Sequence, residues 1–293
     1  MSAPTFTRPP VASMTGSEHT GLRATQEQAV VLYASVVFIG ELWSQGGCAS
    51  ANRDEMTIGV VVISALWHIP GARTLINPLK LFTIGWHELC HMAAAIFTGG
   101  RITRCGIGTP VRCISIDPNT GGCTRVEGGH PPTILAAGYF GSTLIGAGLI
   151  IAGWDTLAAK IASFPVAIGL AVPLILVRDI FTIILIFIYE GLLIGFWFIN
   201  HADALRYYCL FLGIMSIFFV VWDFIDDRFF KKLNDSDATQ FSLLYPKVPA
   251  HYWAIGWFLF SALVFIAMLL VGIAVFKRTP AEMQAEAEHF LPT

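Results

Sequence analysis

Charged side chains are scarce in this sequence. Asp, Glu, Lys and Arg make up only 13% of its 293 residues, whereas hydrophobic residues make up 55% and the mean hydropathy is +0.66. An ordinary soluble domain carries about 25% charged residues, so this composition excludes that class and indicates a chain whose solvent is the lipid bilayer. A basic excess is missing too, because the formal net charge is -2, and we therefore expect no nucleic-acid partner.

Paired cysteines and a signal sequence are also missing. The six cysteines show no Cys-x-x-Cys spacing, which excludes the structural zinc modules built on that pattern. Residues 1–27 contain no apolar core of seven or more residues, so they predict a disordered N-terminal tail rather than a cleavable signal peptide. Residues 28–276 are expected to form one membrane domain, and residues 277–293 a C-terminal tail.

Long apolar runs fill the middle of the chain. A membrane-spanning helix needs about 20 such residues, because the hydrocarbon core is about 30 Å thick and each residue rises about 1.5 Å. Four runs meet this length: Pro132 to Ala152, Ile180 to Ile199, Tyr207 to about Ile225, and Tyr252 to Phe276. Weaker candidates are Val30 to Trp43, Met56 to Ile69, and Pro165 to Val177, the last as half of a broken pair with Ile180 to Ile199. With one more helix from Leu79 to about Thr98, the sequence predicts an all-α polytopic transmembrane helix bundle with six to eight spans.

This last helix has clear end signals. Pro78 suits its start, because the first turn of a helix leaves the backbone N–H of that position without a partner in any case. Gly99-Gly100 suits its end, because glycine tolerates the left-handed conformation that often closes a helix.

The same helix carries the motif His87-Glu88-Leu89-Cys90-His91. Residues four apart share one helix face, so His87 and His91 can present two imidazole nitrogens to one metal ion at about 2.0–2.1 Å. Glu88 then lies beside the metal, where it can take a proton from an activated water and pass it to a leaving amine. Ionisable groups inside an apolar run are costly unless they are paired or bind a metal. The motif therefore predicts a zinc-dependent peptide hydrolase.

A catalytic zinc needs a third protein ligand from elsewhere in the chain. Asp223 follows the apolar run Ile214 to Trp222 and is the most deeply embedded of three neighbouring aspartates, so we expect it to be that ligand. Asp226 and Asp227 lie near the same helix face. Either of them is an alternative ligand, or an acceptor that orients a ligating histidine.

Two other segments bear on how the site is built. The stretch from Gly99 to Pro132 is rich in Gly, Thr and Arg and is expected to be a plain connecting loop, although strands that offer an edge to an extended substrate are an alternative. Glycines in the next helix allow close approach of a neighbouring backbone, and we expect that neighbour to be the helix with the two histidines. These glycines are Gly138, Gly141, Gly146 and Gly148.

Several short motifs follow one another along the chain in the order found in a known family. The chain contains the His87 to His91 motif, Thr98-Gly99-Gly100-Arg101, Gly121-Gly122, Ala136 to Ser142, Asp223 to Asp227, and Ser236-Asp237-Ala238. In this it resembles the site-2-protease-like membrane zinc metallopeptidases, most closely the B-like branch of peptidase family fifty, over about Pro70 to Phe241. The resemblance implies a zinc site built from the two histidines and an aspartate near the end of a later span.

We therefore expect an integral, multi-pass membrane zinc metalloendopeptidase that hydrolyses a peptide bond of a membrane-associated protein. His87, His91 and Asp223 would bind Zn²⁺, and Glu88 would activate water. Two other functions stay open at this point: a catalytically inactive membrane scaffold or trafficking relative, and, with less support, a transporter. A transporter would have no need for a glutamate directly between two histidines of one helix face.

Overall fold

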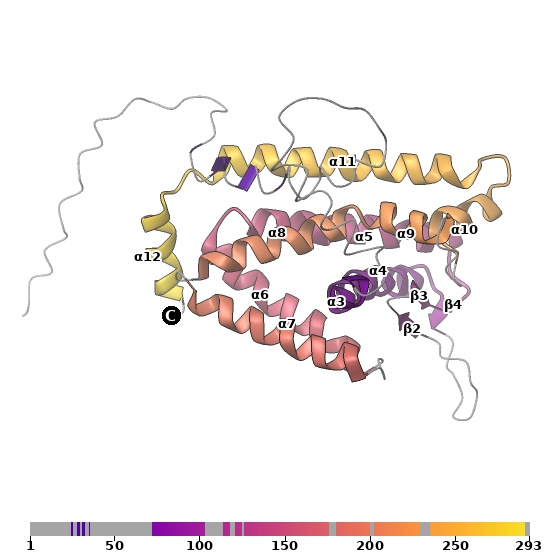
Figure 1. Ribbon diagram of the computed structural model, residues 1–293. Coiled ribbons are helices and arrows are strands. Elements are labelled where there is room, and N and C mark those ends of the chain that lie inside the picture. The colour runs from indigo at the N-terminus through magenta and orange to yellow at the C-terminus, as the bar shows by residue number, and fades with distance from the viewer. Residues whose placement is uncertain are drawn as a thin grey trace, which may run out of the picture.

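The computed structural model describes residues 72–102, 114–117, 121–124, 126–175, 180–199, 202–228 and 235–290, together with Thr25 and five positions between residues 28 and 35 (Figure 1). Most of this part of the chain is helical. The helices are α3 (Ala72–Leu75), α4 (Asn77–Phe97), α5 (Pro131–Ala152), α6 (Thr156–Ala171) with the 3-10 turn η2 (Val172–Ile175), α7 (Ile180–Phe198), α8 (Asp203–Ile217), α9 (Phe219–Arg228), α10 (Asp237–Leu244), α11 (Ala250–Val275) and α12 (Pro280–Phe290).

The long helices form a bundle around α5 and α8, which pack directly on each other. Helix α11 runs along one side of the bundle, while α6 and α7 pack on the opposite side (Figure 1). Helix α12 closes one end, and α10 lies at the other end, close to the short strands (Figure 1). The start of α5, the C-terminal half of α9 and α10 therefore meet at the end of the bundle away from α12.

Four helical segments are long and apolar enough to cross a membrane: Pro131–Ala152, Thr156–Ile175, Ile180–Phe198 and Ala250–Val275. Helices α8 and α9 would add a fifth span if they cross together, although they bend by 52° at their junction. Four to five spans are thus found among the described residues, and the predicted six to eight are not confirmed. Helix α4, which carries the ionisable motif residues, is not among these segments. The candidates Val30 to Trp43 and Met56 to Ile69 lie almost wholly outside the described residues.

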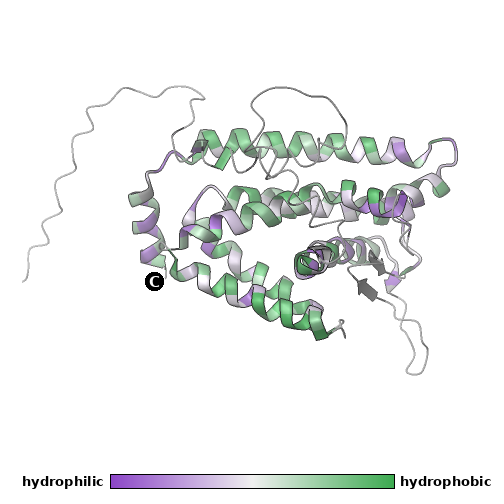
Figure 2. Ribbon diagram, in the orientation of Figure 1, coloured by the Kyte–Doolittle hydropathy of each residue, from purple (hydrophilic) through white to green (hydrophobic). Residues whose placement is uncertain are grey.

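The outer faces of α7 and α11 are apolar (Figure 2). On α11, Leu259, Leu263, Ile266 and Leu270 recur at helical spacing and are between 47% and 68% exposed. An apolar stripe of this length facing water would be a strong aggregation liability, whereas lipid solvates it well. The protein is therefore an integral membrane protein.

Short strands follow α4, so the expectation of a plain connecting loop from Gly99 to Pro132 is wrong. Strand β1 (Arg101–Ile102) pairs with β4 (Val126–Glu127), and β2 (Ile114–Asp117) pairs with β3 (Gly121–Thr124), both antiparallel. Strands β2 and β3 lie against α4. The fold is therefore mainly helical, with two small strand pairs beside the helix that carries the motif.

The predicted ends of α4 are confirmed. Pro78 lies in its first turn, and Gly99 follows its last residues with a φ of 83°, in the left-handed region that glycine adopts without strain.

The C-terminal segment contains a packed helix rather than only a tail. Met283 and Ala287 of α12 are buried, and α12 lies against α6. Lys160 of α6, whose side chain is fully buried, donates through Nζ to the carbonyl oxygen of Ala287 at 3.1 Å. Arg278 pairs with Asp155, the residue that caps the start of α6, at 3.1 Å. Helix α12 is thus held to the end of the bundle by both polar and apolar contacts.

Glycines allow α5 to approach two neighbours. Gly138 and Gly141 face α4, as expected, because a methyl group at either position would overlap His87 and His91 or Cys90. Gly146 faces α8 instead, where a methyl group would lie 2.5 Å from the backbone nitrogen of Ile217 and 2.7 Å from the carbonyl oxygen of Gly213. Gly148 faces open space. One helix therefore packs closely on both α4 and α8 through different glycines.

We predict that Gly146→Ala destabilises the bundle by about 1–3 kcal/mol, because the added methyl forces the backbones of α5 and α8 apart. Thermal unfolding of the detergent-solubilised protein measures this as a lowered Tm. Gly148→Ala is the matched control on the same helix and is expected to be neutral or slightly stabilising, since the methyl meets nothing. Equal Tm values for the two variants would contradict the close packing of α5 on α8.

Candidate metal centre

The three ionisable residues of the motif are buried on α4. His87, Glu88 and His91 are 4%, 5% and 6% exposed. The rings of His87 and His91 lie side by side with their centroids 4.5 Å apart, and their Nε2 atoms are separated by 3.0 Å. The i, i+4 spacing therefore brings both imidazoles to one point, as the sequence predicts.

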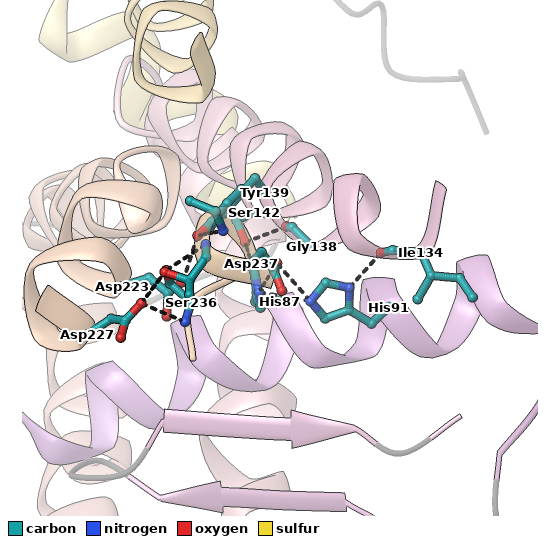
Figure 3. Close-up of polar contacts among 12 residues, drawn as sticks. His87, His91, Ile134, Gly138, Tyr139, Ser142, Asp223, Asp227, Ser236 and Asp237 are labelled. Carbon is teal, nitrogen blue, oxygen red and sulfur yellow. Dashed lines mark hydrogen bonds and ion pairs between the residues drawn. The ribbon is translucent and has the colours of Figure 1, made fainter. Parts of the chain in front are cut away.

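Asp237, the first residue of α10, completes this cluster (Figure 3). Its Oδ2 atom lies 3.0 Å from His87 Nε2 and 3.1 Å from His91 Nε2. Within the described part of the chain, these three residues are the only group of three or more His, Cys, Asp or Glu side chains close enough to share a metal ion. The side chain of Asp237 is 8% exposed, so all three donors are shielded from bulk water.

Asp237 occupies the position that we expected for Asp223. The carboxylate of Asp223 instead accepts a hydrogen bond from the hydroxyl of Tyr139 at 2.7 Å. Asp227 accepts hydrogen bonds from residues at the start of α10, and neither it nor Asp226 belongs to the cluster. The depth of Asp223 in the apolar run is a measure of burial, whereas the carboxylate that reaches the two histidines belongs to Asp237, on a separate short helix.

The three donor atoms fit a zinc ion. Ligand atoms bound at about 2.0–2.1 Å in a tetrahedral arrangement lie about 3.3 Å from one another. The three separations here are 3.0, 3.0 and 3.1 Å. Asp237 Oδ2 is buried and has no partner with hydrogen-bond geometry, although it lies within ion-pair distance of both rings. A buried oxygen in this state fits a carboxylate that binds a cation.

Hydrogen bonds on the far sides of the two rings support the same assignment. His91 Nδ1 lies 2.6 Å from the carbonyl oxygen of Ile134, which can only accept, so this nitrogen carries the proton. His87 Nδ1 lies 3.2 Å from Ser142 Oγ, which itself donates to the carbonyl oxygen of Gly138 at 2.8 Å and can therefore accept from His87. In the neutral rings, both Nε2 atoms then present lone pairs toward Asp237, which is the tautomer that metal binding requires.

Helix α5 leaves room for the rings through a glycine. A methyl group at Gly138 would lie 2.5 Å from His87 Cε1 and 2.5 Å from His91 Nε2. Real side chains do not approach this closely, so only glycine at this position lets both imidazoles keep their orientation. The Tyr139 and Phe219 rings lie on His87 with centroids at 5.3 and 4.6 Å and hold it in place.

Comparison with known proteins identifies the family of the chain. A family model described as Peptidase M50B-like matches residues 56–268, which is most of the chain. The chain belongs to this family. No curated protein and no solved structure matches. Membership of the M50B-like family confirms the resemblance to site-2-protease-like membrane metallopeptidases, and the matched region contains α4, α5, α9 and α10, which together build the cluster.

Sequence reasoning missed Asp237 as a donor, although a signal was present. Ser236 is a good helix-capping residue, and its Oγ accepts from the backbone N–H of Thr239 at 3.2 Å. Asp237 directly after such a cap begins a new helix in a polar segment. The Ser236-Asp237-Ala238 triplet also belongs to the motifs that carry the family resemblance.

We predict that Gly138→Ala lowers the zinc affinity of the purified protein by at least about 10-fold, because the methyl displaces both imidazoles from their shared point. Competition with a chromogenic chelator measures the zinc Kd. Gly148→Ala, which adds the same methyl to an open position of the same helix, should keep the wild-type Kd. A wild-type Kd in Gly138→Ala would mean that the rings do not need the space above this glycine.

Proposed function

We propose that this protein is an intramembrane zinc metalloendopeptidase that hydrolyses a peptide bond of a membrane protein. The observation that carries this proposal is the convergence of His87, His91 and Asp237 on one point, with Glu88 adjacent to the first histidine on α4. The three donors match the ligand number of a catalytic zinc site, which keeps a fourth position for water or substrate. Membership of the M50B-like family supports the same reading.

Each residue has a defined chemical task in this reading. His87, His91 and Asp237 would hold the zinc, which supplies a Lewis acid that polarises the scissile carbonyl and makes water more acidic. Glu88 takes a proton from the attacking water and delivers it to the leaving amine. Glu88 is 5% exposed and follows His87 directly on α4, which supports this role. Ser142 and the Ile134 carbonyl fix the rings through Nδ1.

Two features of the fold are suited to binding a substrate. Strands β2 and β3 lie against α4, and each described strand pairs on one side only, so an extended segment can add to a strand edge. A cavity of about 430 Å³ lies between the start of α5 and α10, lined by Pro131, Leu135, Asp235, Gln240, Leu243 and Leu244. Its walls include Leu135, which follows Ile134, and Asp235, which lies two residues before Asp237. A substrate must be extended at the cleaved bond, because an intact helix buries its scissile amide.

The ligand set is tested by metal content. We predict about one zinc per chain in the wild type and almost none in Asp237→Asn, since the neutral amide is a poor zinc ligand. Elemental analysis of the detergent-purified, zinc-repleted protein provides the measurement. Asp235→Asn is the matched control, because this exposed aspartate lies two residues earlier and should keep its zinc. Zinc retained in Asp237→Asn would remove Asp237 from the ligand set.

The reaction is tested through Glu88. We predict that Glu88→Gln keeps about one zinc per chain but lowers peptide cleavage by at least about 10²-fold, because the amide cannot accept the proton of the attacking water. Membranes from cells that express either form are compared by mass spectrometry of new protein N-termini. Wild type should generate new N-termini within apolar segments of membrane proteins, and Glu88→Gln should not.

Glu282→Gln serves as the control for this comparison, because Glu282 lies on α12 at the far end of the bundle (Figure 1). It should give the wild-type set of N-termini. The same set of N-termini from wild type and Glu88→Gln would sink the assignment of Glu88 as the general base.

A further inference from the structure

We infer that Asp227, together with the pair Tyr139 and Asp223, acts as a positioning clamp that presents Asp237 to the metal. We call these three residues the α9 clamp, because both aspartates lie on α9. The inference rests on the proposed function, since it concerns how the third ligand of that same centre is held. The three clamp residues do not touch the metal position, and they act through the first turn of α10.

Asp237 needs such support because of where it lies. Two of the three metal donors come from α4, a helix of 21 residues packed on α5, whereas Asp237 is the first residue of α10, which has only eight residues. A helix of that length is not stable by itself and depends on contacts for its position. A ligand must nevertheless be held to within about 0.5 Å for good metal geometry. Contacts at the start of α10 therefore decide whether Asp237 reaches the histidines.

Asp227 makes three such contacts with one oxygen (Figure 3). Its Oδ2 accepts from the backbone nitrogen of Ser236 at 3.0 Å, from Ser236 Oγ at 2.7 Å and from Thr239 Oγ1 at 2.6 Å. These donors lie immediately before Asp237 and two residues after it. The carboxylate thus ties the residue before the ligand, and a side chain two residues after it, to the end of α9.

Tyr139 and Asp223 form the second half of the clamp. The hydroxyl of Tyr139 donates to Asp223 Oδ2 at 2.7 Å and accepts from the backbone nitrogen of Ala238 at 3.4 Å. Tyr139 is 1% exposed, and its ring also lies against His87. One phenol therefore links α9, the residue after Asp237, and one of the metal-binding histidines.

The geometry of α9 serves both contacts. Asp223 and Asp227 are four residues apart and therefore share one face of α9. Helix α9 is bent by 52° relative to α8. Ordinary capping does not explain Asp227, because Ser236 already fills that role by accepting from the N–H of Thr239. Asp227 instead binds the capping residue itself. These contacts fix where α10 begins relative to α9, in addition to the cap that Ser236 provides.

The test measures zinc affinity in folded protein. We predict that Asp227→Ala weakens the zinc Kd by about 10–100-fold, as expected for loss of a group that orients a ligand, and that Asp227→Asn is intermediate because its amide oxygen still accepts. Tyr139→Phe removes one hydroxyl and should weaken the Kd by about 10-fold. The protein is purified in detergent, and each Kd is determined by chelator competition.

Cobalt(II) in place of zinc adds a spectroscopic readout. Its visible absorption depends on the number and geometry of the ligands, so a displaced Asp237 changes the band positions and intensities in the clamp variants. Asp155→Ala is the matched control. Asp155 also accepts a hydrogen bond at the start of a helix, here from Ala158 of α6, and it lies at the other end of the bundle. This variant should lower the Tm while it keeps the wild-type Kd and cobalt spectrum.

The outcomes separate the two proposals. Wild-type Kd and cobalt spectrum in folded Asp227→Ala and Tyr139→Phe, with zinc bound by the wild type, would overturn the clamp and leave the proposed function intact. No zinc in the repleted wild type would overturn the proposed function and the clamp with it. If Asp227→Ala does not fold, Tyr139→Phe decides, because the loss of one hydroxyl leaves the packing of the ring in place.

Discussion

The Nε2 atoms of His87 and His91 lie 3.0 Å apart inside a helix bundle and share one carboxylate oxygen of Asp237, at 3.0 and 3.1 Å. The lone pairs of three such atoms repel one another unless a cation or a proton lies between them. Little water reaches this buried position to screen that repulsion. Much of the local architecture follows from this constraint. Gly138 leaves space for the rings, Ile134 and Ser142 set their tautomers, and α10 brings the carboxylate.

Two residues of the cluster lie on a helix fixed by close packing, and the third lies on a short helix held by side-chain contacts. Helices α4 and α5 are locked together at Gly138 and Gly141, so the two histidines have little freedom. The third donor arrives on α10, whose other side is stacked on α11 through Phe241 and Trp253 with ring centroids 4.7 Å apart. The polar clamp and this aromatic contact together define where α10 sits. The cluster thus joins the closely packed pair α4 and α5 to the short helix α10, which side-chain contacts hold in place.

Sequence patterns predicted several of the helices and two of the three residues that meet in the cluster. The apolar runs identified α5, α7 and α11, and the i, i+4 rule placed His87 and His91 on one face of a helix that ends at Gly99. Asp223 was chosen by its depth in an apolar run, a criterion that measures burial but not direction. The Ser236 cap marks where α10 begins, but whether α9 or α10 lies against the two histidines depends on long-range packing, which that local signal does not encode. The short strands beside α4 were missed for a related reason, since strands of two to four residues carry almost no periodic signal.

The order of the donors along the chain has a consequence for biogenesis. His87 and His91 belong to an early helix, whereas Asp237 follows α5 to α9 and precedes only α11 and α12. A chain emerging from the ribosome therefore carries an incomplete centre until nearly all of its membrane helices have been made. His87, His91 and Asp237 therefore come together late in synthesis, after most of the bundle that surrounds them has been translated.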